Sequence, residues 1–277
     1  MAKYMSPVRV NEDGYELHFP PPTGLGDLPY GIPNPFGESS NQLFPLGTEL
    51  VYGLRTFRYA KMGSVAGAVG SIYQRVVPLA GHIDEVISSP AIGATTISFT
   101  PNTVTTDDLA LDELADGYIY MNGTEAGLGQ MYRIKSHPAI TGATSGVITL
   151  WDAIRVAPHA DLTATVIHNP YRNVIIHPSP ATARMVGVCP IAVTANYYFW
   201  IQTKGLSPVL VDGTTIVAGE FVIASPGTVG GTGVDGACSK LVPTEAAPPT
   251  GGNRQVIGIV EVVVAAADYA LINLQLD

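Results

Sequence analysis

The sequence predicts an all-β protein, and three observations lead to this prediction. The 277-residue chain contains 30 Gly and 22 Pro, which interrupt helices and favour short strands joined by turns. Short apolar stretches recur between turn-forming pairs such as Asn122-Gly123, Asn169-Pro170 and Asp212-Gly213. Helical patterns that could connect parallel strands do not separate these stretches. We therefore expect two sandwich- or barrel-like β modules, with at most one or two short helices.

Residues 1–48 are predicted to form an extended N-terminal arm. They contain eight prolines and show no apolar period of 2 or 3.6 residues. The segment is nevertheless too apolar for a solvated linker, so we expect it to lie on its own body or on a neighbouring chain. Its aromatic residues are the predicted anchors to a partner: Tyr15, Phe19, Tyr30, Phe36 and Phe44.

Two β modules are predicted to follow the arm, over residues 49–178 and 179–277, and the second carries a long Gly/Pro/Ala loop at 225–254. Only residues 107–115 have a helical pattern, with acidic residues near the start. After an alternating stretch at 49–59, the predicted strands are 72–77, 95–100, 117–121, 130–135, 146–151, 162–168, 173–177, 185–194, 196–203, 207–211, 220–224, 255–264 and 268–275.

Charge and hydropathy restrict the classes of partner. The net charge is −9, and the 14 basic residues are scattered, which argues against nucleic acid and against an anionic membrane surface. No apolar window is long enough to span a bilayer, and the segment 1–7 lacks the apolar core of a signal peptide, so we expect assembly in a cytoplasm. In such a reducing compartment Cys189 and Cys238 are expected to be free thiols, with Cys189 buried.

No motif in the sequence predicts a cofactor, a metal site or a catalytic centre. Residues 231–236 match G-x-G-x-x-G by letter but precede no helical pattern, so a loop is the better interpretation. His159, His168 and His177 lack a close ligand pair, and turn or surface roles are favoured over zinc. The acidic residues of 107–116 lack the alternation of a calcium loop, and G-x-S-x-G is absent.

The aromatic run at 196–200 allows two interpretations. On a strand, Tyr197 and Phe199 point to one face, and Tyr198 and Trp200 point to the other. A strand covered on both faces explains this pattern without a ligand. Alternatively, Tyr198 and Trp200 stack on a glycan.

Several segments resemble capsid decoration (cement) proteins and related head proteins of tailed bacteriophages. Residues 59–70 are similar to an aromatic, basic and then small, Gly-rich opening of such proteins. A second set of segments is similar to a β-barrel module of the same class: 195–205, 209–214, 256–261 and 268–272.

The resemblance implies a non-enzymatic virion protein on the exterior of a capsid. It would bind the major capsid protein and itself, as a homo-oligomer in which a trimer is favoured over a dimer. The alternatives are a head-fibre or tail-associated glycan-binding protein and, less favoured, a polysaccharide-cleaving enzyme.

Overall fold

The computed structural model describes residues 9–12, 15–18, 33–101, 107–122, 129–142, 144–156, 163–226, 233–241, 255–265 and 268–277, the first two ranges as backbone alone. The chain is 44 % strand and 1 % helix, which confirms the all-β prediction. Within the described ranges, the helical part is a single 3-10 turn, η2 (Ala80–His82).

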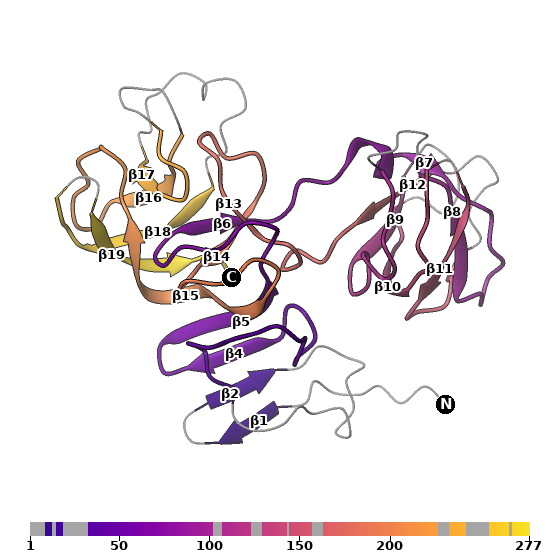
Figure 1. Cartoon of the computed structure of the whole chain (residues 1–277), viewed down its shortest axis with the longest axis horizontal. Coiled ribbons are helices and arrows are strands. Elements are labelled where there is room, and N and C mark those ends of the chain that lie inside the picture. Colours follow the sequence, from indigo (N-terminus) through magenta and orange to yellow (C-terminus); the bar gives the residue numbers. More distant parts are fainter. Residues whose placement is uncertain are drawn as a thin grey trace. The chain divides into compact units, whose positions relative to one another are not determined.

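The chain divides into two compact units (Figure 1). Unit 1 comprises residues 1–76 and 170–277, and unit 2 comprises residues 77–169. This division differs from the predicted consecutive modules 49–178 and 179–277, because unit 2 is inserted into unit 1. The physical reason is strand pairing across the insertion: β6 (Ile72–Gln74) pairs with β13 (Ile175–Ile176) and β14 (Met185–Val188).

Unit 1 contains a 13-stranded sheet whose main path runs β1-β2-β4-β5-β15-β19-β18-β16-β17. Three apolar clusters pack against it, the largest around β14, β18 and β19. The strands of this path are β1 (Arg9–Glu12), β2 (Tyr15–His18), β4 (Glu49–Tyr52), β5 (Arg55–Lys61), β15 (Tyr198–Leu210), β19 (Tyr269–Gln275), β18 (Val256–Val262), β16 (Phe221–Ala224) and β17 (Cys238–Lys240).

β15 is one 13-residue strand, where the sequence predicts two strands at 196–203 and 207–211. Its first half pairs with β5, and its second half pairs with β19. Gly205 lies where the partner changes; its φ is 83°, and a Cβ there would collide with the carbonyl oxygen of Leu54. A glycine is therefore required for the close approach of two chain segments at this position.

The predicted N-terminal arm contributes strands to the sheet of its own chain. β1 pairs with β2, and β2 pairs with β4 in the register Tyr15↔Tyr52 to His18↔Glu49. β3 (Glu38–Ser39) pairs with the start of β15. These strands pair through backbone groups, which every residue except proline supplies, so strand formation did not require an apolar period.

Unit 2 is a six-stranded antiparallel sheet whose edges meet. Ile87 bridges Phe99, Ser88 N donates to Ser98 O at 3.0 Å, and Thr100 N donates to Val86 O at 3.2 Å. These bonds close the sheet around a separate apolar core. The strand order is β7 (Glu85–Val86), β12 (Thr163–Ile167), β9 (Tyr118–Asn122), β10 (Met131–Ser136), β11 (Gly146–Leu150) and β8 (Thr96–Phe99).

The helix predicted at 107–115 is wrong. These residues form turns, and Leu109 is in a bridge with Ile140. Asp112 has a φ of 55° and its carboxylate accepts a hydrogen bond from His137 N at 2.9 Å. The tertiary hydrogen bond and the left-handed backbone at Asp112 interrupt the helical path that the sequence pattern favours.

The region predicted as one long loop, 225–254, contains a strand. β17 pairs with β16 through Val222↔Lys240, Ile223↔Ser239 and Ala224↔Cys238. The remainder of the predicted loop, at 227–232 and 242–254, lies outside the described residues.

Candidate functional site

The outer edge of the unit 1 sheet is the feature most suited to binding a partner. Among the strands that the structure describes, β1 pairs with β2 alone, so its other side has no described strand neighbour. An edge strand presents a row of backbone N–H and C=O groups that an incoming strand can pair with. We define β1, β2 and β4 as the outer edge of unit 1.

The β4–β5 hairpin supports this edge through its two faces. Leu50 pairs with Phe57 on the buried face, and both side chains are fully buried. Glu49 pairs with Arg58 on the other face, where their side chains form an ion pair of 2.6 Å. Apolar packing on one face and charge pairing on the other are the alternation that fixes the register of a strand pair.

An aromatic cluster forms the buried face. The Phe44 ring centroid lies 5.2 Å from those of Tyr59 and Trp200, and Tyr59 and Trp200 are 5.0 Å apart. The Tyr59 hydroxyl accepts a hydrogen bond from Leu43 N at 3.0 Å. Burial raises the pKa of Tyr59 to about 12, so its hydroxyl stays protonated at neutral pH. The segment before β4 is thereby fixed to β5 and β15.

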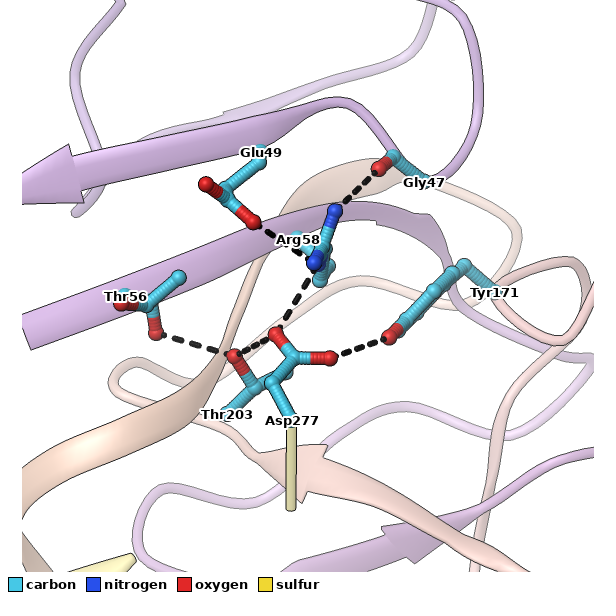
Figure 2. Close-up of polar contacts among 7 residues, drawn as sticks. All are labelled: Gly47, Glu49, Thr56, Arg58, Tyr171, Thr203 and Asp277. Carbon is cyan, nitrogen blue, oxygen red and sulfur yellow. Dashed lines mark hydrogen bonds and ion pairs between the residues drawn. The ribbon is translucent and has the colours of Figure 1, made fainter. Parts of the chain in front are cut away.

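The opposite face is held by a polar cluster around Arg58, which Figure 2 shows. Arg58 Nε lies 2.9 Å from Asp277 Oδ2, and Arg58 Nη1 donates to Gly47 O at 3.2 Å. Thr203 Oγ1 donates to the same carboxylate of Asp277 at 2.6 Å. The cluster joins β5, β15 and the end of the chain after β19.

The electrostatics of this cluster favour its charged form. Burial acts to lower the pKa of Arg58, but Asp277 and Glu49 outweigh burial, so the pKa of Arg58 is raised. Tyr171 Oη lies 3.5 Å from Asp277 Oδ1, and burial raises the pKa of Tyr171 to about 12. A cation between two carboxylates therefore links these segments and stabilises the sheet.

Two of the predicted partner anchors lie among residues whose side chains are described. Phe36 is 43 % exposed, and its ring makes an edge contact with Phe57 at 6.2 Å. Arg55 Cζ lies 5.3 Å from the Phe36 ring and 5.0 Å from the Phe57 ring. Phe44 is only 5 % exposed and belongs to the aromatic cluster, so in this chain it packs on its own body.

The other three predicted anchors give less information. Tyr15 is in β2, where its backbone pairs with Tyr52. Phe19 and Tyr30 lie outside the described residues. Of the five predicted anchors, Phe36 is therefore the one with a described and exposed side chain.

The predicted glycan-stacking residues lie at a small cavity. Tyr198 is half-buried and stacks on Tyr59, with ring centroids 6.0 Å apart and an interplanar angle of 11°. Trp200 is 3 % exposed and packs in the aromatic cluster. The cavity has a volume of about 150 Å³ and is lined by Pro33, Asn34, Gly37, Glu38, Ser39, Leu43, Phe44, Tyr59, Tyr198 and Trp200.

The facing predicted for the aromatic run is correct. Phe199 belongs to one buried cluster with Tyr197 at its margin, and Trp200 belongs to another with Tyr198 at its margin. β15 is thus covered on both faces, as the interpretation without a ligand requires. Trp200 has no open face for a sugar.

The remaining chemical candidates have structural roles. Cys189 and Cys238 are free and buried; burial raises the pKa of the Cys238 thiol to about 12 and that of Cys189 further, which leaves both unreactive. His168 Nε2 lies 3.2 Å from Glu113, His177 lies between the carbonyl oxygens of Pro178 and Ala237, and His159 lies outside the described residues.

Neither a metal centre nor a membrane-spanning helix is found within the described ranges. No three side chains of His, Cys, Asp or Glu there come close enough together to hold a metal ion. No helix in these ranges has the length and apolarity that crossing a membrane requires.

Sequence reasoning missed the outer edge and the Arg58 cluster. Residues 9–18 carry no strand pattern that stands out, and Arg58 and Asp277 are 219 positions apart. The one available signal was the alternation at 49–59, which indicated a strand pair but not its neighbours. Comparison of the chain with known protein families, with curated proteins and with solved structures finds no significant match.

Proposed function

We propose that the protein is a non-enzymatic structural protein of a virion, which binds the major capsid protein on the outside of a capsid lattice and stabilises that lattice. The observation that carries this proposal is the outer edge of unit 1. A β1 strand with one side free of described neighbours can pair with a strand of a lattice subunit.

The outer edge is firmly connected to the core of unit 1, as binding across capsid subunits requires. β1 is linked through β2 and β4 to β5, and β5 is held by the aromatic cluster on one face and by the Arg58 cluster on the other. A strand added at β1 would therefore connect a partner to the core of unit 1 by continuous backbone hydrogen bonding. Binding across subunits favours the assembled shell by mass action and requires no chemistry.

The self-association that we propose, with a trimer favoured, has its support in composition. Charged residues make up only 13 % of the chain, and apolar side chains such as Leu54, Val65 and Val86 are 66–88 % exposed. Low charge and exposed apolar side chains favour contacts between copies of a chain. Light scattering after size exclusion measures the mass, and a monomer at all concentrations would contradict this part of the proposal.

The edge is tested with proline variants of the full-length chain. Consecutive residues of an antiparallel strand direct their N–H groups to opposite sides, so of Val10→Pro and Asn11→Pro one removes a donor to β2 and the other removes a donor to an incoming strand. We expect the variant that lacks the N–H group facing away from β2 to keep the stability of the wild type. The same variant should lose binding to empty expanded shells of the parent virus.

Two further measurements complete this test. Leu54→Gln is the matched control, because Leu54 is 88 % exposed in the β4–β5 turn and lies away from β1 in the sheet order. This control should bind shells as the wild type does. Full occupancy of the shells by both proline variants would show that β1 is not the binding edge.

The structure also defines the truncation that would test the N-terminal segment. Removal of residues 1–48 would delete Phe44 and Leu46 from the aromatic cluster and would expose Leu50. Removal of residues 1–32 leaves that cluster intact. We expect this shorter truncation to fold and to lose shell binding.

The glycan-binding alternative now depends on Tyr198 alone, since Trp200 is buried. Tyr198 lines the cavity together with Glu38 and Asn34, which supply polar groups beside an aromatic ring. Glycan binding that is lost in Tyr198→Ala but kept in Phe36→Ala would favour this alternative over lattice binding.

A further inference from the structure

Three arginines of unit 1 gather at one end of a small group of strands. Arg75 directly follows β6, Arg184 directly precedes β14, and Arg172 lies three residues before β13. β6 is antiparallel to both β13 and β14, so its C-terminal end lies beside their N-terminal ends. Residues far apart in the sequence therefore meet at the same end of these strands.

Arg75 and Arg184 lie directly opposite each other. Gln74 of β6 pairs with Met185 of β14. One residue further along, Arg75 N donates a hydrogen bond to Arg184 O at 3.0 Å, so the pairing extends to these two residues. Opposite residues of an antiparallel pair place their side chains on the same face, with Cβ atoms about 4.5–5.5 Å apart. Two like charges in this position destabilise the pairing unless a counter-charge lies beside them.

The interactions of these arginines do not supply that counter-charge. Among the described residues, Asp and Glu form ion pairs with Arg58, Arg133 and His168, but none with Arg75, Arg172 or Arg184. Burial, and then the charge of Arg184, lower the pKa of Arg75. The two guanidinium groups are thus close enough for the charge of Arg184 to act on Arg75.

Two of the three arginines have a buried donor atom without a described hydrogen-bond partner. Arg75 Nη2 and Arg172 Nε are both buried and have no hydrogen-bond partner within the described part of the chain, while Arg75 Nε uses the carbonyl oxygen of Val76 at 3.3 Å. A guanidinium carries only donors and keeps its charge, so such an atom requires an acceptor. Arg184 is exposed, so an anion in solution can reach its guanidinium.

We infer that Arg75 and Arg184, with Arg172, bind a tetrahedral oxyanion of the phosphate or sulfate class. Such an anion supplies several acceptor oxygens in different directions, which can serve donors from more than one guanidinium. It also supplies a negative charge, which no described Asp or Glu brings to the opposed pair as an ion pair. This inference is independent of the lattice-binding proposal, because no residue of the outer edge takes part in it.

The first test is calorimetric titration of the full-length protein with inorganic phosphate and with sulfate, at constant ionic strength in chloride. We expect one site per chain, and a Kd at least ten-fold higher in Arg75→Gln and in Arg184→Gln. Lys204→Gln is the matched control, since Lys204 is an exposed cation of the same unit, and it should bind as the wild type does. A phosphate monoester in a parallel titration distinguishes a free anion from a phosphoryl group on a larger molecule.

A second measurement separates a binding site from a merely structural one. In chloride buffer without phosphate, Arg184→Gln should unfold at a higher temperature than the wild type, because it removes the repulsion with Arg75. With saturating phosphate this order should reverse. Arg184→Lys keeps the charge without the planar fork and should bind with intermediate affinity.

Two results would overturn the inference. One is phosphate and sulfate having no saturable effect beyond that of chloride. The other is Arg184→Gln binding as tightly as the wild type, or losing affinity no more than Lys204→Gln does.

Discussion

The sheet of unit 2 joins its two edges, whereas the sheet of unit 1 runs out to β1 at one end of its path. In unit 2, hydrogen bonds between segments 86–88 and 98–100 occupy the backbone groups that would otherwise form an edge. In unit 1, β1 pairs with one described strand, whereas β17 is also bridged to Val211 at Cys238. A closed sheet leaves no unpaired backbone groups for a strand of another chain, whereas an open edge can pair with such a strand.

The units also differ in charge. Unit 2 contains ten Asp and Glu against three Lys and Arg, whereas unit 1 contains thirteen against eleven. The three cations of unit 2 all lie against aromatic rings: Arg133 and Lys135 against Trp151, and Arg155 against Tyr132. Unit 2 is therefore a closed, acidic module, and unit 1 holds both the open edge and a cluster of arginines that form no ion pair with a described Asp or Glu.

This contrast places the open edge and a self-contained closed core in different parts of one chain. Unit 2 interrupts unit 1 in the sequence but has its own core, which shares no residue with the three cores of unit 1. We therefore expect core changes to act locally. Substitutions in each unit test this separation, beginning with the one expected to lower the free energy of unfolding most.

Phe99→Ala should destabilise unit 2 by about 3–5 kcal/mol, because it leaves a cavity beneath the strand that closes the sheet. Hydrogen exchange followed by mass spectrometry should show lost protection in β8, β9 and β11 and unchanged protection in β15 and β19. Phe221→Ala is the matched control, because Phe221 is 47 % exposed, and it should change little. Equal loss of protection in both units would mean that they unfold as one.

Arg58→Ala should destabilise unit 1 by about 1.5–3 kcal/mol, since it removes charged hydrogen bonds and leaves the carboxylates of Glu49 and Asp277 without their cation. Urea denaturation followed by intrinsic fluorescence measures the loss. Lys204→Ala, at an exposed position of β15, should have almost no effect. If the two variants were equally stable, the cluster would not support the outer edge.

Acidification should weaken the β17 side of unit 1 by a smaller amount. His177 is fully buried, and burial lowers the pKa of His177, so the unfolded chain takes up the proton first. The contribution of neutral His177 to stability is complete above about pH 6.5, the ordinary pKa of histidine. It declines as the pH falls from there toward the lower pKa of the folded state, by about 1.4 kcal/mol for each pH unit between the two pKa values.

The measurement for His177 is the free energy of unfolding at pH 7.5 and at pH 5.5. Ala237 and Gly236 contact His177, so lost protection should appear first next to β17. His177→Gln should lose part of the dependence on pH. A pH dependence identical to that of the wild type would assign the effect to other groups.

Much of the secondary structure could be predicted from local pattern. Predicted strands at 95–100, 146–151 and 268–275 match β8, β11 and β19 closely. In each of them, buried and more exposed side chains alternate along the strand, and this period of two can be read from the sequence. The aromatic run at 196–200 even revealed which rings share a face. The helix at 107–115 failed, because the bridge of Leu109 to Ile140 and the hydrogen bond of Asp112 to His137 override a weak local preference.

The candidate site was much less accessible to sequence reasoning. Phe44 was predicted to anchor a partner but is a core residue, since its burial depends on neighbours from β4 and β5. Arg75 and Arg184 stand 109 positions apart, and only the antiparallel pairing of β6 with β14 places them opposite each other.

Composition and local pattern were enough to predict the all-β class, the positions of most strands and the burial of Cys189. These properties depend on residue content and on contacts between residues close in the chain. Only the folded chain reveals that unit 2 is inserted and closed, that the N-terminal segment extends the sheet, and that Arg58 meets Asp277. Backbone hydrogen bonds join strands but are the same for every residue type except proline, so the choice of partner depends on packing between residues that are far apart in the sequence.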